Sequence, residues 1–261
     1  MISVSAGVIQ TDVQLGNVSA NLKQTKRHIQ SLARKKVKIM VLPELWSTGF
    51  SYANINQLSN TTPEILDHIS NMARQFNAII IGSLPEKIHD KIFNTAYVID
   101  ENGQIAATYQ KIHLFSPTQE DRHFGRGEKS VVCNTSAGPI GLLICYDLRF
   151  PELCRSLALQ GAKIIVVCAQ WPEARLIHWQ TLLRARAIEN QAFILASNRC
   201  GQDQTVAYAG RSQIISPFGD ILASAGKRPA GIISTLDFNV LNKFRETIPC
   251  FADRIVEAYG S

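Results

Sequence analysis

Three polar side chains that directly follow apolar runs could together carry out acyl transfer. Glu44 follows the run at 38–42 by way of Pro43, Lys111 follows "ATYQ", and Cys145 follows "GLLI". A cysteine is a nucleophile, a carboxylate can shuttle its proton, and an ammonium can stabilise an oxyanion. Taken singly, an ion-paired glutamate, a solvated lysine and a core cysteine are the simpler explanations. Because ligands bind at the carboxyl ends of strands in α/β proteins, the set together predicts an active site.

Cys145 is expected at a corner between a strand and a helix. The apolar run 141–144 indicates a buried strand, and polar residues begin at Tyr146. Pro151 then has the position of a first-turn proline in a new helix. The corner therefore places the thiol at a strand end.

The elements that must position these residues alternate between strands and helices. Residues 2–8 alternate as a first strand, the stripe from Val18 to Leu32 predicts a helix, and 37–42 is typical of a fully buried strand. The pattern repeats with a helix over 61–76 and a strand over 78–84, and Asn102-Gly103 predicts the hairpin that follows. The second half supplies strands at 139–145, 163–169 and 192–198, helices at 151–161 and 177–191, and shorter strand-like segments from 211 to 237.

This order predicts an α/β fold in which two sheets pack face to face with helices outside, an α-β-β-α sandwich. The chain has 261 residues and 46% hydrophobic content, which suffices for a large core. No linker-like stretch interrupts it, so we expect one domain over 1–261.

The composition of the chain argues against several classes of protein. The apolar runs are far shorter than the ~18 residues of a membrane span, and the N-terminus has no signal-peptide layout, so we expect a cytoplasmic protein without a membrane partner. The net charge is +6, but the basic stretch 34–38 closes a predicted helix, which disfavours a nucleic-acid surface. The six cysteines lack paired spacing and the histidines lack ligand spacing, so we expect free thiols, no metal and no cofactor.

Three motifs of the sequence closely resemble those of the nitrilase superfamily, the carbon-nitrogen hydrolases. They are "VLPELW" around Glu44, "YQKIHLF" around Lys111 and "ICYDLRFPE" around Cys145, in matching order and spacing. The resemblance extends over essentially the whole chain. It implies a four-layer sandwich, assembly into homodimers or larger oligomers, and a second glutamate, Glu120, beside the lysine and the substrate.

The chemistry of these residue types then predicts a mechanism. Glu44 takes the thiol proton, Cys145 attacks an amide carbonyl, and Lys111 with the backbone N–H of Tyr146 stabilises the oxyanion. Ammonia or an amine leaves, and water hydrolyses the thioester. Glu120 holds Lys111 or the substrate amide in place.

Three further residues, Arg149, Trp171 and Arg175, are weaker candidates for substrate binding. Arg149 is a candidate ligand, although we expect it instead to be a buried ion-pair anchor beneath the corner. Trp171 either lines the pocket or belongs to the core or an interface.

The stretch beginning at Trp171 and the ending "RETIPCFADRIVEAY" look most like the ω-amidase branch, whose members remove the terminal amide of short dicarboxylate monoamides such as 2-oxoglutaramate. Such a substrate keeps a carboxylate, and Arg175 is the candidate cation, with a solvent-facing arginine as the alternative. A nitrilase, an N-carbamoyl amino-acid amidohydrolase, an aliphatic amidase and a non-catalytic binding protein remain alternatives, although an intact nucleophile with its base disfavours the last.

Overall fold

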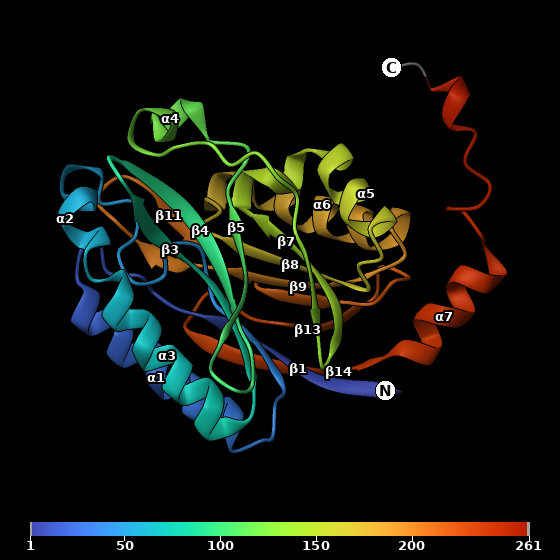
Figure 1. The fold of residues 1–261 in the computed structure, drawn as a ribbon, viewed down its shortest axis with the longest axis horizontal. Coiled ribbons are helices and arrows are strands. Elements are labelled where there is room, and N and C mark those ends of the chain that lie inside the picture. The colour runs from blue at the N-terminus through green and yellow to red at the C-terminus, as the bar shows by residue number, and fades with distance from the viewer. Residues whose placement is uncertain (1, 260–261) are drawn as a thin grey trace.

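Two six-stranded mixed sheets form the centre of the protein, in a computed structural model that describes residues 2–259 (Figure 1). The first sheet has the order β14 (Ala230–Asp237), β1 (Ser3–Gln10), β2 (Ile39–Val41), β3 (Ile79–Ile88), β4 (Lys91–Ile99), β5 (Ile105–Gln110). The second has the order β13 (Ile221–Ser224), β12 (Gln213–Ile215), β9 (Phe193–Asn198), β8 (Ile164–Ala169), β7 (Gly138–Ile144), β6 (Val132–Thr135). A two-stranded ribbon pairs β10 (Cys200–Gln202) with β11 (Ala207–Ala209).

Helices cover the outer face of each sheet. Helices α1 (Val18–Ala33) and α3 (Thr62–Phe76) pack on the first sheet, and α5 (Pro151–Leu159) and α6 (Leu176–Glu189) pack on the second (Figure 1). The predicted α-β-β-α sandwich is therefore confirmed. The sequence did not predict strand β6 or the helices α2 (Ile55–Ser59), α4 (Glu120–His123) and α7 (Phe238–Thr247). None of the helices between residues 2 and 259 is long and apolar enough to span a bilayer.

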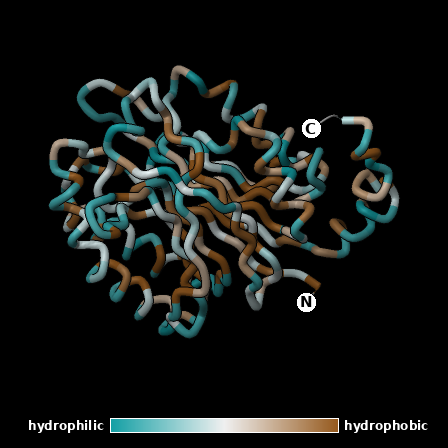
Figure 2. Tube along the Cα trace, turned by 45° about the horizontal axis from the view of Figure 1, so that its top comes forward, coloured by the Kyte–Doolittle hydropathy of each residue, from teal (hydrophilic) through white to brown (hydrophobic). Residues whose placement is uncertain are grey.

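Alternation along the strands builds one core between the sheets and one beneath each helical layer. On β7, Ile140, Leu142 and Ile144 point into the inter-sheet core, whereas Leu143 packs with the helices outside. Successive side chains of a strand face opposite sides, and both sides are covered here, which explains the unbroken apolar runs. Figure 2 shows these hydrophobic segments gathered in the central strands.

The carboxyl ends of the parallel strands of both sheets lie at one edge of the sandwich. Strands β1, β2 and β3 are parallel, as are β7, β8 and β9. The Ser197 hydroxyl at the end of β9 donates to the Ile9 carbonyl of β1 at 2.6 Å, and the Cys200 N–H donates to the Thr11 carbonyl at 2.9 Å. Loops from both sheets are thereby held over one edge of the sandwich.

The predicted hairpin at Asn102-Gly103 is confirmed and determines where the following residue lies. It joins β4 to β5, with Gly103 at φ 75°, a conformation that glycine adopts without strain. Strand β5 then returns to the same edge of the sheet, so Lys111, directly after it, arrives beside the other strand ends.

Candidate active site

The thiol of Cys145 lies on a sharp corner. Strand β7 ends at Ile144, Cys145 has φ 46°, and a short 3₁₀ turn over Cys145–Arg149 follows. A non-glycine residue in this left-handed region costs about 1–2 kcal/mol, so the surrounding contacts must hold it there. The predicted corner is confirmed, although a 3₁₀ turn precedes the helix.

The buried carboxylate of Asp147 supplies those contacts. It accepts hydrogen bonds from the Ile144 N–H at 2.9 Å and the Tyr109 hydroxyl at 2.8 Å. It also accepts the His113 backbone N–H at 3.1 Å and lies 2.8 Å from the His113 Nδ1. Since Tyr109 and His113 flank the lysine, Asp147 ties the lysine loop to the cysteine corner.

Lys111 lies between two buried carboxylates. Its Nζ is 2.8 Å from Glu44 Oε1 and 2.9 and 2.8 Å from the two oxygens of Glu120. All three side chains have at most 1% exposure. Burial alone would lower the pKa of Lys111, but the charges of Glu120 and Glu44 outweigh it and raise this pKa well above its ordinary value. The two carboxylates therefore favour the cationic form of the lysine.

Each oxygen of Glu44 has its own partners. Oε1 accepts from Lys111 and from Asn94 Nδ2 at 2.9 Å, and Oε2 accepts from the backbone N–H of Gln170 at 3.0 Å. Burial raises the pKa of Glu44 and the charge of Glu120 adds to the rise, while Lys111 opposes it. Because Oε1 is held by two donors, Oε2 is the oxygen better placed to receive a proton.

The surroundings of Cys145 shift its pKa in favour of the neutral thiol. Burial raises the pKa of Cys145 well above its ordinary value, and the negative charge of Glu44 adds to the rise, against a smaller opposing effect of Lys111. The raised pKa favours the neutral thiol, so nucleophilic attack by Cys145 requires a base to take its proton.

Glu120 begins the short helix α4, where the sequence alone indicates a loop. Its Oε2 accepts the Phe115 N–H at 2.7 Å in addition to the lysine contact. The side chain is fully buried. Glu120 is thus a second carboxylate that holds Lys111, and Asn94 Nδ2 contacts both Glu44 and Glu120 at 2.9 and 3.4 Å.

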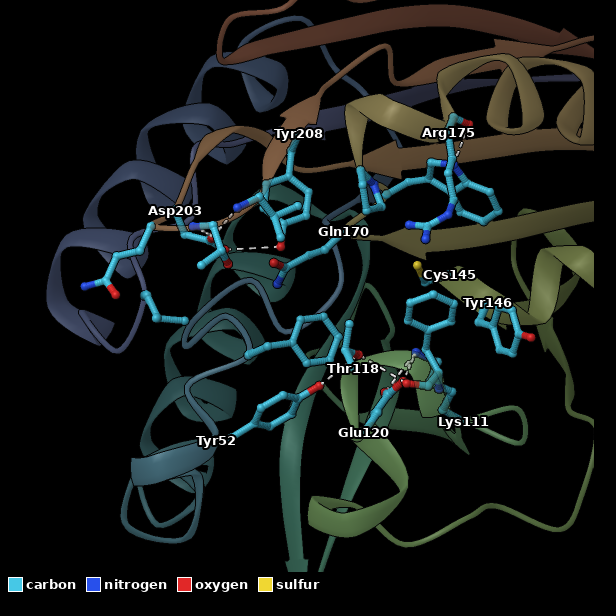
Figure 3. Close-up of a pocket in the computed structure, with 18 of the residues that line it drawn as sticks. Tyr52, Lys111, Thr118, Glu120, Cys145, Tyr146, Gln170, Arg175, Asp203 and Tyr208 are labelled. Carbon is cyan, nitrogen blue, oxygen red and sulfur yellow. Dashed lines mark hydrogen bonds and ion pairs between the residues drawn. The ribbon is translucent and has the colours of Figure 1, made fainter.

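These groups open into a cavity of about 290 Å³. Lys111, Glu120 and Cys145 line it, and Glu44 lies behind them, fully buried. Figure 3 shows the Cys145 sulfur facing the cavity, with Lys111 and Glu120 on one side and Arg175 on another. Aromatic rings make up much of the remaining wall, at Phe50, Tyr52, Phe115, Tyr146, Trp171 and Tyr208.

The three weaker candidates all lie on the cavity wall. Trp171 is 3% exposed and belongs to the outer core as well as the wall, and its indole N–H donates to the Arg175 carbonyl at 2.8 Å. The expectation that Arg149 is a buried ion-pair anchor is wrong. Its guanidinium is half-buried, stacks 4.6 Å from the Trp171 ring, and has no carboxylate within 4 Å among residues 2–259.

Sequence reasoning missed several residues of the site. Gln170 directly follows β8, so the strand-end rule that found Cys145 could have found it too. Asn94 lies inside β4, where no local signal marks it. The turn at 203–206 joins β10 to β11 and adds four residues to the cavity wall.

The fold and the site define a class of protein, an α-β-β-α sandwich with a cysteine, a glutamate and a lysine together at one cavity, which is the residue set of a cysteine hydrolase. The carbon-nitrogen hydrolase family model matches residues 5–246, so the chain belongs to the carbon-nitrogen hydrolase family, the nitrilase superfamily. It is an amidase of that superfamily with a Glu-Lys-Cys triad.

Known relatives agree with this assignment. The 2-oxoglutaramate amidase of Bacillus subtilis is 35% identical, covering 94% of this chain and 95% of that protein. The 2-oxoglutaramate amidase of Paenarthrobacter nicotinovorans is 38% identical, covering 87% and 81%. The crystal structure of a carbon-nitrogen hydrolase from Helicobacter pylori has a TM-score of 0.93 at 26% identity, covering 99% of this chain and 97% of that one.

Proposed function

We propose that the protein hydrolyses the terminal amide of a short dicarboxylate monoamide such as 2-oxoglutaramate, releasing ammonia. The observation that carries the proposal is the pair of guanidinium groups, Arg149 and Arg175, on the wall of the cavity that holds Cys145. Neither has a carboxylate partner within 4 Å among the described residues. Two relatives named 2-oxoglutaramate amidase support the substrate class.

Acylation begins with transfer of the thiol proton. Glu44 accepts the proton as the Cys145 sulfur attacks the amide carbon, and the carbonyl π electrons move to oxygen. Lys111 and the backbone N–H of Tyr146 stabilise that oxyanion. The lysine can do so because two of its three contacts go to one carboxylate, Glu120, and one of those can be released.

Collapse of the tetrahedral intermediate breaks the carbon–nitrogen bond. Glu44 returns its proton to the nitrogen, ammonia leaves, and a thioester on Cys145 remains. Water then gives a proton to Glu44 and attacks the thioester carbon. Breakdown expels the sulfur, which regains the proton from Glu44, and the acid product leaves.

Arg175 is the proposed anchor for the free carboxylate of the substrate. Its guanidinium lies 5.4 Å from the Phe115 ring, within the same cavity wall as the nucleophile. A planar guanidinium can donate two parallel hydrogen bonds to a carboxylate. Arg149, stacked on Trp171, is the second candidate donor.

Ammonia release from three substrates tests the proposal. We expect turnover of 2-oxoglutaramate and little with a simple nitrile or an N-carbamoyl amino acid. The Arg175→Gln variant should raise KM for 2-oxoglutaramate by ~10-fold or more, since a hydrogen bond to a charged group contributes about 1.5–3 kcal/mol. Its KM for a neutral amide such as propionamide should not change. Ammonia from the nitrile alone would overturn the substrate assignment.

We also propose that the protein acts as a homodimer or larger homo-oligomer in the cytoplasm. Large apolar side chains are exposed on α6 at Ile177 and in the C-terminal segment at Ile255 and Val256, which extends away from the sandwich (Figure 1). Such surface favours a second copy as its cover. All six cysteines are free, as in a reducing compartment. Sedimentation analysis should give at least twice the 28.9 kDa chain mass, and a monomer would refute this assembly.

A further inference from the structure

Arg199 is a buried cation that the proposed mechanism does not use. It follows β9 directly, and its side chain is 1% exposed. Its backbone N–H donates to the Ala169 carbonyl at 3.0 Å, and its guanidinium lies 4.2 Å from the Tyr208 ring. Burying a guanidinium is costly unless it is paired, so its partners indicate what it is for.

The first partner is Gln170, which makes three contacts that fix its conformation. Its backbone N–H donates to Glu44 Oε2, and its side-chain Nε2 donates to the Glu44 carbonyl at 2.8 Å. Its Oε1 accepts from Arg199 Nη1 at 3.0 Å. Because a guanidinium can only donate, Arg199 requires the amide oxygen to face it, which leaves Nε2 for Glu44.

Gln170 also lines the cavity together with Cys145. Gln170 therefore contacts the Glu44 oxygen that is better placed to take a proton, and it shares the cavity wall with the nucleophile. Because the Gln170 N–H holds Glu44 Oε2, the position of Gln170 helps to fix that oxygen.

The second partner of Arg199 is Asp203, in the turn that forms part of the cavity wall. Asp203 Oδ2 accepts from Arg199 Nη1 at 3.2 Å, and Oδ1 accepts the N–H groups of Thr205 and Val206 at 3.2 and 2.9 Å. Burial opposes ionisation of Asp203, but these N–H groups and the Arg199 charge outweigh it, so its pKa is lowered. The pair is therefore ionised at neutral pH.

We propose that Arg199 is a positioning residue that ties Gln170, and through it the Cys145 and Glu44 pair, to the Asp203–Val206 turn of the cavity wall. This rests on the proposed role of Glu44 as proton acceptor. Arg199 does not touch the substrate or the reacting atoms. Without it, the Gln170 amide loses the donor that sets its orientation, and the proton path from sulfur to carboxylate loses its alignment.

The test compares Arg199→Lys and Asp203→Asn with Arg245→Lys. Arg245 is a matched control, because its guanidinium donates to the Gln191 and Ala162 carbonyls away from the cavity. Two readouts are needed: kcat and KM for amide hydrolysis, and the rate at which iodoacetamide alkylates Cys145 as a function of pH.

We expect kcat of Arg199→Lys to fall by ~10-fold or more with KM within about twofold, as misalignment of reacting groups predicts. Alkylation should become slower at neutral pH, with its midpoint at higher pH. Asp203→Asn, which keeps an acceptor oxygen, should show smaller changes in the same direction. If Arg199→Lys fails to fold, the result with Asp203→Asn tests the positioning role.

Folded Arg199→Lys or Asp203→Asn protein with parental kcat and a parental alkylation profile would overturn the proposal. Alkylation needs no substrate, so the two proposals can fail separately. If 2-oxoglutaramate is not hydrolysed and the alkylation profile still shifts, the substrate assignment fails and the positioning role stands.

Discussion

For single residues, a substitution of Glu120 can distinguish the effect of its charge from the effect of its side-chain shape. The Glu120→Gln variant keeps the size of the side chain and removes the charge that helps to hold Lys111. We expect kcat to fall by ~10- to 100-fold, as for the loss of an electrostatic partner in a buried site. Circular dichroism should confirm a native fold. Unchanged kcat in the folded variant would show that Glu44 alone suffices to hold the lysine.

The pH dependence of kcat/KM follows from the pKa shifts of the same residues. The pKa of Glu44 is raised from 4.5, so below that raised value it is protonated and cannot accept the thiol proton. The acid limb should therefore lie above 4.5. The pKa of Lys111 is raised well above 10.5 and that of Cys145 well above 9.0, so activity should persist through pH 9.0. A fall in kcat/KM centred below pH 9.0 would instead indicate that Cys145 and Glu44 already form a pair of thiolate and protonated carboxyl before the substrate reacts.

How far the sequence predicts the site depends on whether a residue follows a strand. Lys111 and Cys145 follow strands directly, and Glu44 follows one after a short loop, so local pattern and motif both find them. Asn94 reaches Glu44 from within β4 only because β4 pairs between β3 and β5. That pairing is a long-range property which no local window contains.

At the scale of elements, the Asp147 carboxylate joins the loop after β5 to the corner after β7. Replacement by asparagine puts an NH₂ group among donors that need an acceptor. We expect Asp147→Asn to lower the free energy of unfolding by about 1–3 kcal/mol and to lower kcat more than it raises KM. Urea denaturation and steady-state kinetics measure the two effects.

Asp237→Asn is the matched control for that variant. Asp237 caps α7 through the Asn239 N–H, far along the chain from the cavity residues, and asparagine caps equally well. Parental kcat in Asp147→Asn would mean that the corner holds its geometry without this clamp.

The elements that the sequence predicts well are the long and periodic ones. The stripes of α1 and α3 and the apolar runs of β7, β8 and β9 give clear signals. Helix α4 has only four residues and β6 only four, too few to establish a period. These short elements depend on tertiary contacts, such as the bonds from Glu120 to Lys111 and Phe115.

At the scale of the whole molecule, the inter-sheet core holds both halves of the site together. Leu142 is 1% exposed between the sheets. We expect Leu142→Ala to lower the free energy of unfolding by about 2–5 kcal/mol through loss of burial and a residual cavity. Ile105→Ala, at a 48% exposed position on β5, should change it by less than about 0.5 kcal/mol. Equal effects of the two variants would contradict the assigned core.

We propose that Cys145 carries the acyl group during turnover, and acid-quenched mass spectrometry of the reacting protein can detect that acyl-enzyme. With 2-oxoglutaramate, we expect a transient adduct on the peptide containing Cys145, heavier by the mass of the substrate less ammonia. Ammonia release at the parental rate by the Cys145→Ala protein, with no adduct on that peptide in the parent, would contradict it.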